Sequence, residues 1–337
     1  MTRTASALAT FLAAALIAAG CGGGAGSKDP DRNRDVRQDM MDFVAGLSAW
    51  ARQQDTNFIV IPQNGQEIYS DDFEPSDPID TGYFDAIDGS GREDLFYGYD
   101  ADNEATPASV TGELKAFLDV YKANGKTVLV IDYINTAAGA ADSYGRNAAA
   151  GYVGFAADHR DLDDIPATLA SAPPTGYPNA TSVASLSQMQ NFLYIINPGA
   201  YSSKTAFLAD IAATNFDMVL VDAFDQNGTL LTAGNVTALK TKNNGATRLA
   251  IAYMSIGEAE DYRFYWQSGW KPGNPNWLGE ENPDWPGNYK VRYWDPEWQA
   301  IIYGNADAYL QKILDQGFDG VYLDIIDAFE YWESKFN

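Results

Sequence analysis

The sequence predicts an α/β fold, a (β/α)8 TIM barrel in which eight parallel strands alternate with helices. Eight apolar runs occur between residues 58 and 324, and most are continuous, as in parallel strands covered on both faces. Helical stretches separate several of these runs. Several runs end in a polar or acidic residue, which suits the active end of a barrel. A doubly wound sheet is the alternative that this pattern allows.

The elements follow in order along the chain. A helix is expected first, at residues 35–53, where apolar residues recur at helical spacing. Strands are expected at residues 58–61, 83–88, 127–133, 151–156, 192–197, 217–222, 248–255 and 320–324. Further helices are expected at 111–124, 204–213, 236–243 and 298–316, and a long loop before the last of these. Thr111 is expected to cap its helix and Gly125 to end it.

The first 34 residues have the pattern of an export signal and a tether. Residues 1–20 place Arg3 before an almost continuous apolar stretch that is too short for a membrane span. Small residues before Cys21 resemble a bacterial lipobox, so Cys21 is expected to carry a lipid; signal cleavage beside an incidental cysteine is the alternative. Residues 21–34 would be a flexible tether, and residues 35–337 a single domain. The expected location is the bacterial cell envelope or surface, with membrane contact only through the lipid.

Charge and composition exclude several classes of function. The formal net charge is −24, and cleavage before Cys21 leaves 46 acidic against 21 basic residues, a net charge of −25. Such a surface disfavours nucleic acid and anionic membranes; it favours a cationic ligand, or it keeps an exported protein soluble. One cysteine and one histidine, His159 in an expected surface loop, exclude a Cys- or His-rich zinc site. Phosphate-binding and nucleophile-elbow motifs are absent from the sequence, so no cofactor or metal is expected.

Acid–base chemistry is therefore assigned to carboxylates. After the predicted strand 248–255, Glu258, Glu260 and Asp261 fall within four residues, and their repulsion requires a proton, Arg263 or a cationic ligand. Six tryptophans follow, which can stack on sugar rings or fasten a long loop to the barrel: Trp266, Trp270, Trp277, Trp285, Trp294 and Trp298. Acids and aromatics at one end of a barrel suggest a glycosidase, which needs two carboxylates beside the scissile bond.

Four segments resemble glycoside hydrolase family 114, which contains endo-α-1,4-polygalactosaminidases. They are Ile-Pro-Gln-Asn-Gly-Gln-Glu at 61–67, Gly-Arg-Glu-Asp-Leu-Phe-Tyr at 91–97, Tyr-Met-Ser-Ile-Gly-Glu-Ala-Glu-Asp-Tyr-Arg at 253–263, and Gly-Phe-Asp-Gly-Val-Tyr-Leu-Asp-Ile-Ile-Asp-Ala at 317–328. The resemblance implies a barrel that cleaves α-1,4-linked galactosamine polymers, which are cationic where they are not acetylated. In the family the Asp-Gly-Val-Tyr-Leu-Asp strand comes first, so the order here implies a circular permutation. The helix at 35–53 would then be the one that normally follows that strand.

The resemblance also implies the roles of particular residues. Asp324 matches the catalytic Asp, as nucleophile or charge stabiliser, and Glu93 matches the general acid/base, with Asp94 as the alternative to Glu93. Residues near the predicted strand ends are expected to bind substrate: Gln63, Asn64, Asp132, Asp222, Tyr253, Glu258, Glu260, Trp266 and Asp327. The expected partner is a cationic aminosugar polysaccharide, and the expected state is a monomer. The alternatives are a non-catalytic polysaccharide-binding surface lipoprotein on the same barrel, and a glycosidase for a neutral glycan. Retention and inversion both stay open.

Overall fold

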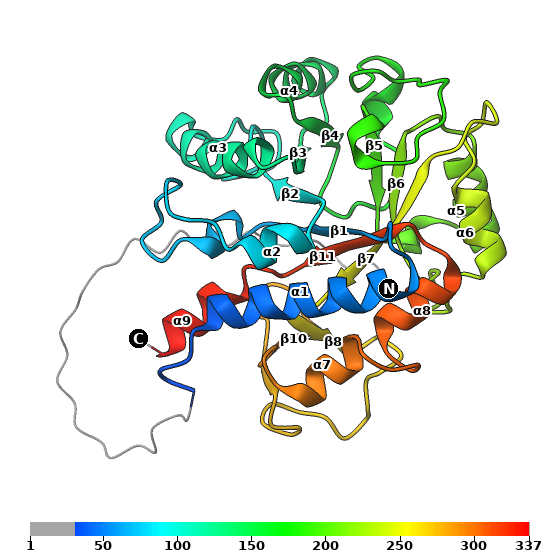
Figure 1. Ribbon diagram of the computed structural model, residues 1–337. Helices are drawn as coiled ribbons and strands as arrows, with labels where there is room; N and C mark the ends of the chain where they lie inside the picture. Colours follow the sequence, from blue (N-terminus) through cyan, green and yellow to red (C-terminus); the bar gives the residue numbers. More distant parts are fainter. Residues whose placement is uncertain (1–30, 337) are drawn as a thin grey trace.

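The computed structural model describes residues 31–336, which form an α/β fold of parallel strands and covering helices (Figure 1). The predicted signal at residues 1–20 and the predicted lipid site Cys21 lie outside them. The helices are α1 (Val36–Gln54), α2 (Thr81–Ala86), α3 (Ala108–Ala123), α4 (Ala137–Ala150), α5 (Lys204–Ala212), α6 (Ala233–Leu239), α7 (Pro296–Ile302), α8 (Tyr309–Gln316) and α9 (Ala328–Phe336). Within residues 31–336, none of these is long and apolar enough to cross a membrane.

The parallel strands fall into two hydrogen-bonded groups. The strands are β1 (Ile59–Pro62), β2 (Gly89–Glu93), β3 (Thr127–Tyr133), β4 (Val153–Ala157), β5 (Phe192–Ile195), β6 (Met218–Asp222), β7 (Leu249–Ser255) and β11 (Gly320–Asp324). One group has the order β1-β11-β7-β6-β5 and the other β2-β3-β4. A parallel bridge between Gln63 and Gly91 links the end of β1 to β2. The carboxyl ends of β11, β1 and β2 therefore lie side by side.

The strand register places two acids two strands apart. β11 pairs with β7 so that Asp324 lies opposite Ser255, and β2 pairs with β3 so that Glu93 lies opposite Ile131. β11 also pairs with β1, which makes the last parallel strand a neighbour of the first. Asp324 thus lies at the end of one strand and Glu93 at the end of the second strand along, with only β1 between them.

The second strand was predicted in the wrong place. Residues 81–86 form α2, not a strand, because the Asp80 carboxylate caps that helix by accepting from Tyr83 N–H at 2.7 Å. The strand is the glycine-rich β2 instead. Thr111 is not a cap either: α3 begins after Pro107, and the Thr111 hydroxyl donates to the Leu95 carbonyl at 2.9 Å. Gly125, beyond the end of α3, has the left-handed backbone typical of a helix stop.

Other differences concern the helices. α4 was not predicted, because its alanine-rich sequence offers few large apolar residues, although Thr136 caps it by accepting from Gly139 N–H at 3.2 Å. The single helix predicted at 298–316 is two helices, α7 and α8. The strand β11 is followed by a helix, α9 (Ala328–Phe336). In Figure 1, α1 runs beside α9, and Arg37 of α1 joins Glu333 of α9 at 2.5 Å.

The long segment after β7 has structure of its own. It contains a small antiparallel sheet of β8 (Glu258–Glu260), β10 (Asn288–Val291) and β9 (Leu278–Glu281), in that order. Buried tryptophans attach it to the domain. Trp298 donates from Nε1 to the Ile256 carbonyl at 2.9 Å, and Trp332 of α9 donates to the Val291 carbonyl at 3.0 Å. The segment is thus packed on the end of β7 and on α9, and it is not a loose loop.

Candidate active site

Asp324 is held at the end of β11 by one side chain and one backbone group. Its Oδ2 accepts a hydrogen bond from the Tyr253 hydroxyl at 2.6 Å, and its Oδ1 accepts from the Ile325 N–H at 2.8 Å. The second contact depends on an unusual turn, because Ile325 has a φ of 61°. β-Branched residues rarely adopt this left-handed conformation. The predicted substrate-binding residue Tyr253 therefore positions Asp324 in this structure.

The same backbone feature recurs at three neighbouring strand ends. Asn64 follows β1 with a φ of 60°, Asp94 follows β2 with a φ of 61°, and Ile325 follows β11. Such conformations cost about 1–3 kcal/mol each and persist only where the surrounding contacts hold them. Their gathering around Asp324 and Glu93 makes this end of the fold the candidate functional site.

Three donors converge on Glu93. Its Oε2 accepts from Gln63 Nε2 at 2.7 Å and from Asn64 Nδ2 at 3.0 Å, and its Oε1 contacts the Tyr133 hydroxyl. Tyr194 donates to the Gln63 side-chain oxygen at 3.2 Å, which turns the amide nitrogen toward Glu93. Gln63 and Asn64, predicted as substrate ligands, thus orient Glu93 in this structure.

Burial and like charge set the protonation of the pair. Burial, and then the charge of Glu93, raise the pKa of Asp324 to about 8, although the Tyr253 hydrogen bond opposes the shift. At neutral pH the site therefore retains a proton on Asp324. Hydrolysis by two carboxyl groups requires one of them to be protonated and the other ionised. Asp324 is thus the member of the pair whose raised pKa favours the protonated form.

Asp94, the alternative to Glu93, lies in a different environment. Burial and the charge of Glu93 raise the pKa of Asp94 to about 7, against the opposing charge of Arg160. Arg160 Nη2 binds Asp94 Oδ1 at 2.8 Å and Arg160 Nε binds Asp102 at 2.6 Å. Asp94 is thus engaged in an ion pair, and the geometry favours Glu93 as the partner of Asp324.

We expect the proton on Asp324 to be visible in the pH dependence of stability. The folded protein holds this proton up to a pKa of about 8, whereas the unfolded chain releases it near pH ~4. The free energy of unfolding should therefore fall as the pH rises from about 4 to 8, because the native state binds more protons. Asp324→Asn should reduce this slope and raise stability at pH 8 by about 1–3 kcal/mol; the slope that remains belongs to other acids with raised pKa values, such as Glu330.

Urea unfolding at pH 5 and pH 8 measures this effect. Asp307→Asn is the control, since Asp307 is exposed on a distant loop. Equal pH slopes in the wild type and in Asp324→Asn would contradict the prediction.

The carboxylates of Asp222 and Glu260 share one buried arginine. Arg263 Nη1 lies 2.9 Å from Asp222, and Arg263 Nε lies 2.6 Å from Glu260. The Tyr262 hydroxyl also donates to Glu260 at 2.6 Å. Burial raises the pKa of Asp222, and Arg263 opposes the shift. Both acids were predicted to bind substrate; in this structure they join the end of β6 to β8.

The side chains of Asp132 and Trp266 interact with other residues of the protein. The buried Asp132 carboxylate accepts from the Phe96 and Tyr97 N–H groups at 2.8 and 3.2 Å. Ser143 and Asn147 of α4 donate to its other oxygen at 2.6 and 3.2 Å. The half-buried Trp266 ring packs on Tyr289, with ring centroids 4.9 Å apart. Both were predicted to bind substrate; in this structure the Asp132 carboxylate is satisfied by the protein, and the Trp266 ring packs within the segment after β7.

A second set of acids lies beside Asp324. Burial and the charge of Glu67 raise the pKa of Asp327 to about 6. Burial and a hydrogen bond with Glu67 raise the pKa of Glu330 to about 9. Glu258 Oε1 binds Lys290 at 2.5 Å and Asn282 at 2.9 Å, whereas its buried Oε2 has no partner among residues 31–336. We call Glu67, Glu258, Asp327 and Glu330 the acidic row.

The acidic row and the pair are electrostatically connected, since the charge of Asp327 contributes to the raised pKa of Asp324. Glu67 and Glu330 were not predicted from the sequence. Nor were three tyrosines around the pair, Tyr133, Tyr194 and Tyr322. A signal was available for the last, because Tyr322 precedes Asp324 by two residues and so lies on the same side of the strand.

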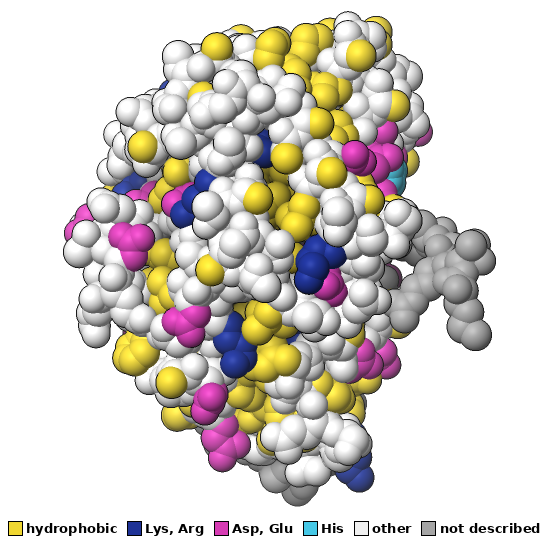
Figure 2. All heavy atoms as spheres, turned by 90° about the vertical axis from the view of Figure 1, so that its right-hand side faces the viewer, with side chains coloured by type: hydrophobic (Ala, Val, Ile, Leu, Met, Phe, Trp, Pro, Cys, Tyr) yellow, Lys and Arg dark blue, Asp and Glu magenta, His cyan; other side chains and the backbone are white. Residues whose placement is uncertain are grey.

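The single histidine forms a separate cluster. His159 Nδ1 lies 2.8 Å from Asp158 and its Nε2 lies 2.5 Å from Asp163. Burial lowers the pKa of His159, but the hydrogen bond with Asp163 and the charge of Asp158 raise it overall. Figure 2 shows the cyan histidine beside acidic side chains on a face where charges are otherwise dispersed. The imidazole thus joins two carboxylates in one surface cluster, apart from the pair.

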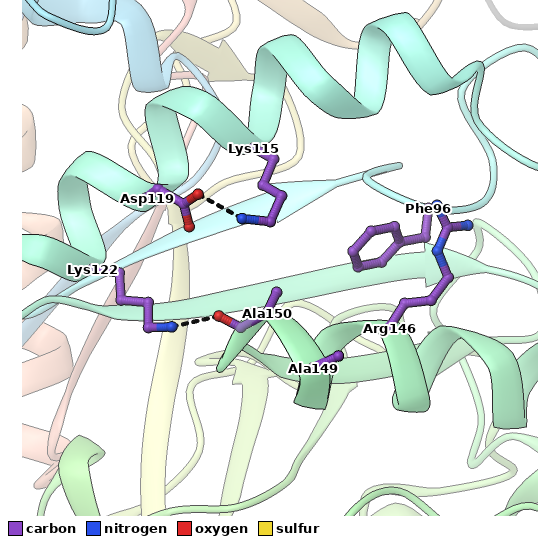
Figure 3. Close-up of a pocket in the computed structure, with 7 residues that line it drawn as sticks. All are labelled: Phe96, Lys115, Asp119, Lys122, Arg146, Ala149 and Ala150. Atoms are coloured by element: carbon purple, nitrogen blue, oxygen red, sulfur yellow. Dashed lines mark hydrogen bonds and ion pairs between the residues drawn. The ribbon is translucent and has the colours of Figure 1, made fainter.

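A surface pocket between α3 and α4 is distinct from the pair (Figure 3). Its cations are Lys115, Lys122 and Arg146. Lys115 binds Asp119 at 2.5 Å, Lys122 donates to the Ala150 carbonyl at 2.5 Å, and Arg146 lies 4.3 Å from the centre of the Phe96 ring. Each cation therefore already has a partner, and the pocket holds no carboxylate pair.

Comparison with known proteins gives a family and three relatives. The model of glycoside-hydrolase family GH114 matches residues 173–337, which supports a glycoside hydrolase. This segment includes Asp324, whereas Glu93 lies before it. An uncharacterized protein, MJ1477, of Methanocaldococcus jannaschii is 44% identical over 154 residues, 46% of this chain and 42% of the relative.

Two further relatives are also uncharacterized proteins. That of Deinococcus radiodurans is 51% identical over 120 residues, 36% of each chain, and that of Thermotoga maritima is 41% identical over 135 residues, 40% of each chain. The chain thus spans less than half the length of these three curated relatives.

Proposed function

We propose that this protein hydrolyses an α-1,4-linked galactosamine-type polysaccharide with Asp324 and Glu93 as paired carboxyl groups. The observation that carries the proposal is the convergence of these two acids on either side of β1, each oriented by its own donors. The raised pKa of Asp324, about 8, favours its protonated form at neutral pH. The match of residues 173–337 to a glycoside-hydrolase family supports the class of reaction.

We further propose a closed barrel that is circularly permuted relative to the family. Four features support it. β11 pairs with β1, and the Gln63–Gly91 bridge joins β1 to β2. At the other junction, Phe155 of β4 and Phe192 of β5 pack with ring centroids 5.6 Å apart. The helix α1 lies beside α9, as expected of a helix that covers the seam between β11 and β1.

In the proposed mechanism, the substrate moves the proton within the pair. An ammonium group bound by the acidic row stabilises the ionised form of Asp324, because opposite charges attract. The proton then passes to Glu93, which protonates the leaving glycosidic oxygen, while Asp324 attacks the anomeric carbon or stabilises its positive charge. Water completes the hydrolysis with Glu93 as the base.

The acidic row supports a cationic substrate. Two of its carboxyl groups, Asp327 and Glu330, have raised pKa values because of burial and the nearby Glu67 carboxylate. A sugar ammonium group would relieve both effects, whereas an acetamido group would not. A neutral glycan gains nothing from this arrangement.

The test compares de-N-acetylated and N-acetylated galactosaminan at two salt concentrations. New reducing ends should appear with the deacetylated polymer, and added salt should slow its cleavage by screening. We expect Glu330→Gln to raise KM for this polymer about three- to tenfold with kcat little changed, a loss of about one ion-pair contact. Glu297→Gln on the exposed surface of α7 is the matched control.

Two outcomes would contradict the proposal. Equal cleavage of both polymers at both salt concentrations would indicate a neutral glycan. Binding without new reducing ends would indicate a non-catalytic polysaccharide-binding protein. We also propose that the protein is exported, anchored through a lipid on Cys21 and monomeric; fractionation of cells and the mass of the purified protein test these points.

A further inference from the structure

A buried tyrosine hydroxyl beneath the pair has no partner. Tyr322 of β11 is 0% exposed, and its hydroxyl makes no hydrogen bond among residues 31–336. An unpaired buried hydroxyl costs about 1–3 kcal/mol, a cost that phenylalanine would avoid. Tyr322 precedes Asp324 by two residues, so both side chains leave the same side of the strand. The unpaired Tyr322 hydroxyl therefore destabilises the fold at a position one side-chain layer below Asp324.

A glycine on the other catalytic strand receives this ring. Gly91 of β2 precedes Glu93 by two residues, as Tyr322 precedes Asp324. A Cβ on Gly91 would lie 1.9 Å from the Tyr322 hydroxyl oxygen and 2.4 Å from its Cζ, far inside contact distance. The backbone of Gly91 is not left-handed, so its small size serves the close approach alone. The Tyr322 ring therefore spans from β11 across β1 to β2.

The other tyrosines around the pair are already engaged. Tyr133 contacts Glu93, Tyr253 donates to Asp324, and Tyr194 donates to Gln63. The Tyr194 ring also packs edge-on against Tyr322, with centroids 5.5 Å apart. Only the Tyr322 hydroxyl, in this group of four, is left without a partner.

We propose that Tyr322, seated against Gly91, is a positioning residue that fixes the spacing of Asp324 and Glu93. Its free hydroxyl serves as a reserve donor to whichever carboxylate is ionised when the pair acts. The pKa of Tyr322 is raised by burial, by Glu93 and by Asp324, so the hydroxyl keeps its proton for donation. The inference rests on the proposed pairing of these two acids.

The test measures the protonation of Asp324 directly and does not depend on catalytic turnover. The charged and polar groups facing Asp324 are Glu93 on β2, Tyr253 on β7 and Asp327 before α9. Carbon-13 NMR of the full chain with labelled aspartate, assigned with Asp324→Asn, gives the titration midpoint of Asp324. Tyr322→Phe should raise that midpoint and lower kcat about tenfold with KM little changed, because the ionised pair loses a donor.

Tyr309→Phe is the matched control. Tyr309 is also fully buried with an unpaired hydroxyl, but it packs near Arg263 rather than near the pair. Its replacement should leave the Asp324 midpoint and kcat unchanged. An unchanged midpoint and kcat in Tyr322→Phe, with greater stability alone, would overturn the proposal.

Substitutions at the glycine separate spacing from stability. Gly91→Ala should displace the Tyr322 ring and lower both the unfolding temperature and kcat. Adding Tyr322→Leu should restore the unfolding temperature, because the smaller side chain removes the clash with the alanine Cβ. It should not restore kcat, because the aromatic ring and its hydroxyl are lost. Recovery of wild-type kcat in the double variant would refute a positioning role. A wild type that cleaves no galactosaminan, while Tyr322→Phe still shifts the Asp324 midpoint, would refute the proposed function alone.

Discussion

Asp324→Asn and Glu93→Gln should each lower kcat on deacetylated galactosaminan by about three orders of magnitude or more, with KM changed only slightly. Asparagine and glutamine keep the shape of each side chain but neither ionise nor transfer a proton. The donors from Tyr253, Gln63 and Asn64 remain in place, so binding should survive. Initial rates of reducing-end formation across substrate concentrations measure both constants.

Chemical rescue distinguishes the two roles. Asp324→Ala opens space beside the anomeric carbon, and azide should restore cleavage there with a glycosyl azide as product. In Glu93→Ala the proton donor is lost, so the deficit should be smallest for substrates with good leaving groups. Asp94→Asn is the control, because Asp94 is paired with Arg160 and is not assigned to the reaction. Activity retained in both Asp324→Asn and Glu93→Gln would refute the assignment of the pair.

Arg263→Met should destabilise the folded protein by about 3–5 kcal/mol, because it leaves two buried carboxylates without their cation. Arg263 is 7% exposed and holds Asp222 and Glu260 at 2.9 and 2.6 Å. Its guanidinium also lies 5.2 Å from the centre of the Phe224 ring. Urea unfolding measures the loss, which should be greater at pH 8 than at pH 5, since the stranded carboxyl groups protonate at the lower pH.

Two further variants calibrate this result. Asp222→Asn and Glu260→Gln added to Arg263→Met should recover much of the stability, because the whole charged network is then neutral. Arg34→Met breaks a more exposed ion pair with Asp39 and should cost at most about 1 kcal/mol. A cost of that size for Arg263→Met would show that the network contributes little.

The strands that the sequence predicted well are those with long apolar runs. β3, β6, β7 and β11 lie within one residue of their predicted ranges, because each is buried along all or nearly all of its length. β2 was missed for a physical reason. Its sequence, Gly-Ser-Gly-Arg-Glu, lacks bulk where Gly91 must admit Tyr322, so it carries no apolar signal. The small residue that lets Tyr322 approach β2 is thus also the reason that the sequence did not predict β2 as a strand.

The candidate site was partly predictable. Acids at strand ends and the resemblance indicated Asp324 and Glu93. The structure places them on the two strands that flank β1. The sequence also offered Arg263 as one of three ways to relieve the repulsion among the acids after β7, and Arg263 binds Glu260 at 2.6 Å. The pairing of Glu258 with Lys290 was not predictable, because it arises from the antiparallel register of β8 and β10 across a segment predicted as loop.

The left-handed residues at the ends of β1, β2 and β11 also limit how the protein can be redesigned. Asn64 and Asp94 are residue types that tolerate this backbone, so exchanges among Asn, Asp and Gly should be accepted there more readily than any β-branched residue. Ile325 is the exception. Glycine at 325 would release strain yet loosen the turn that directs the Ile325 N–H toward Asp324. A library biased toward stability would therefore tend to select against activity at this position.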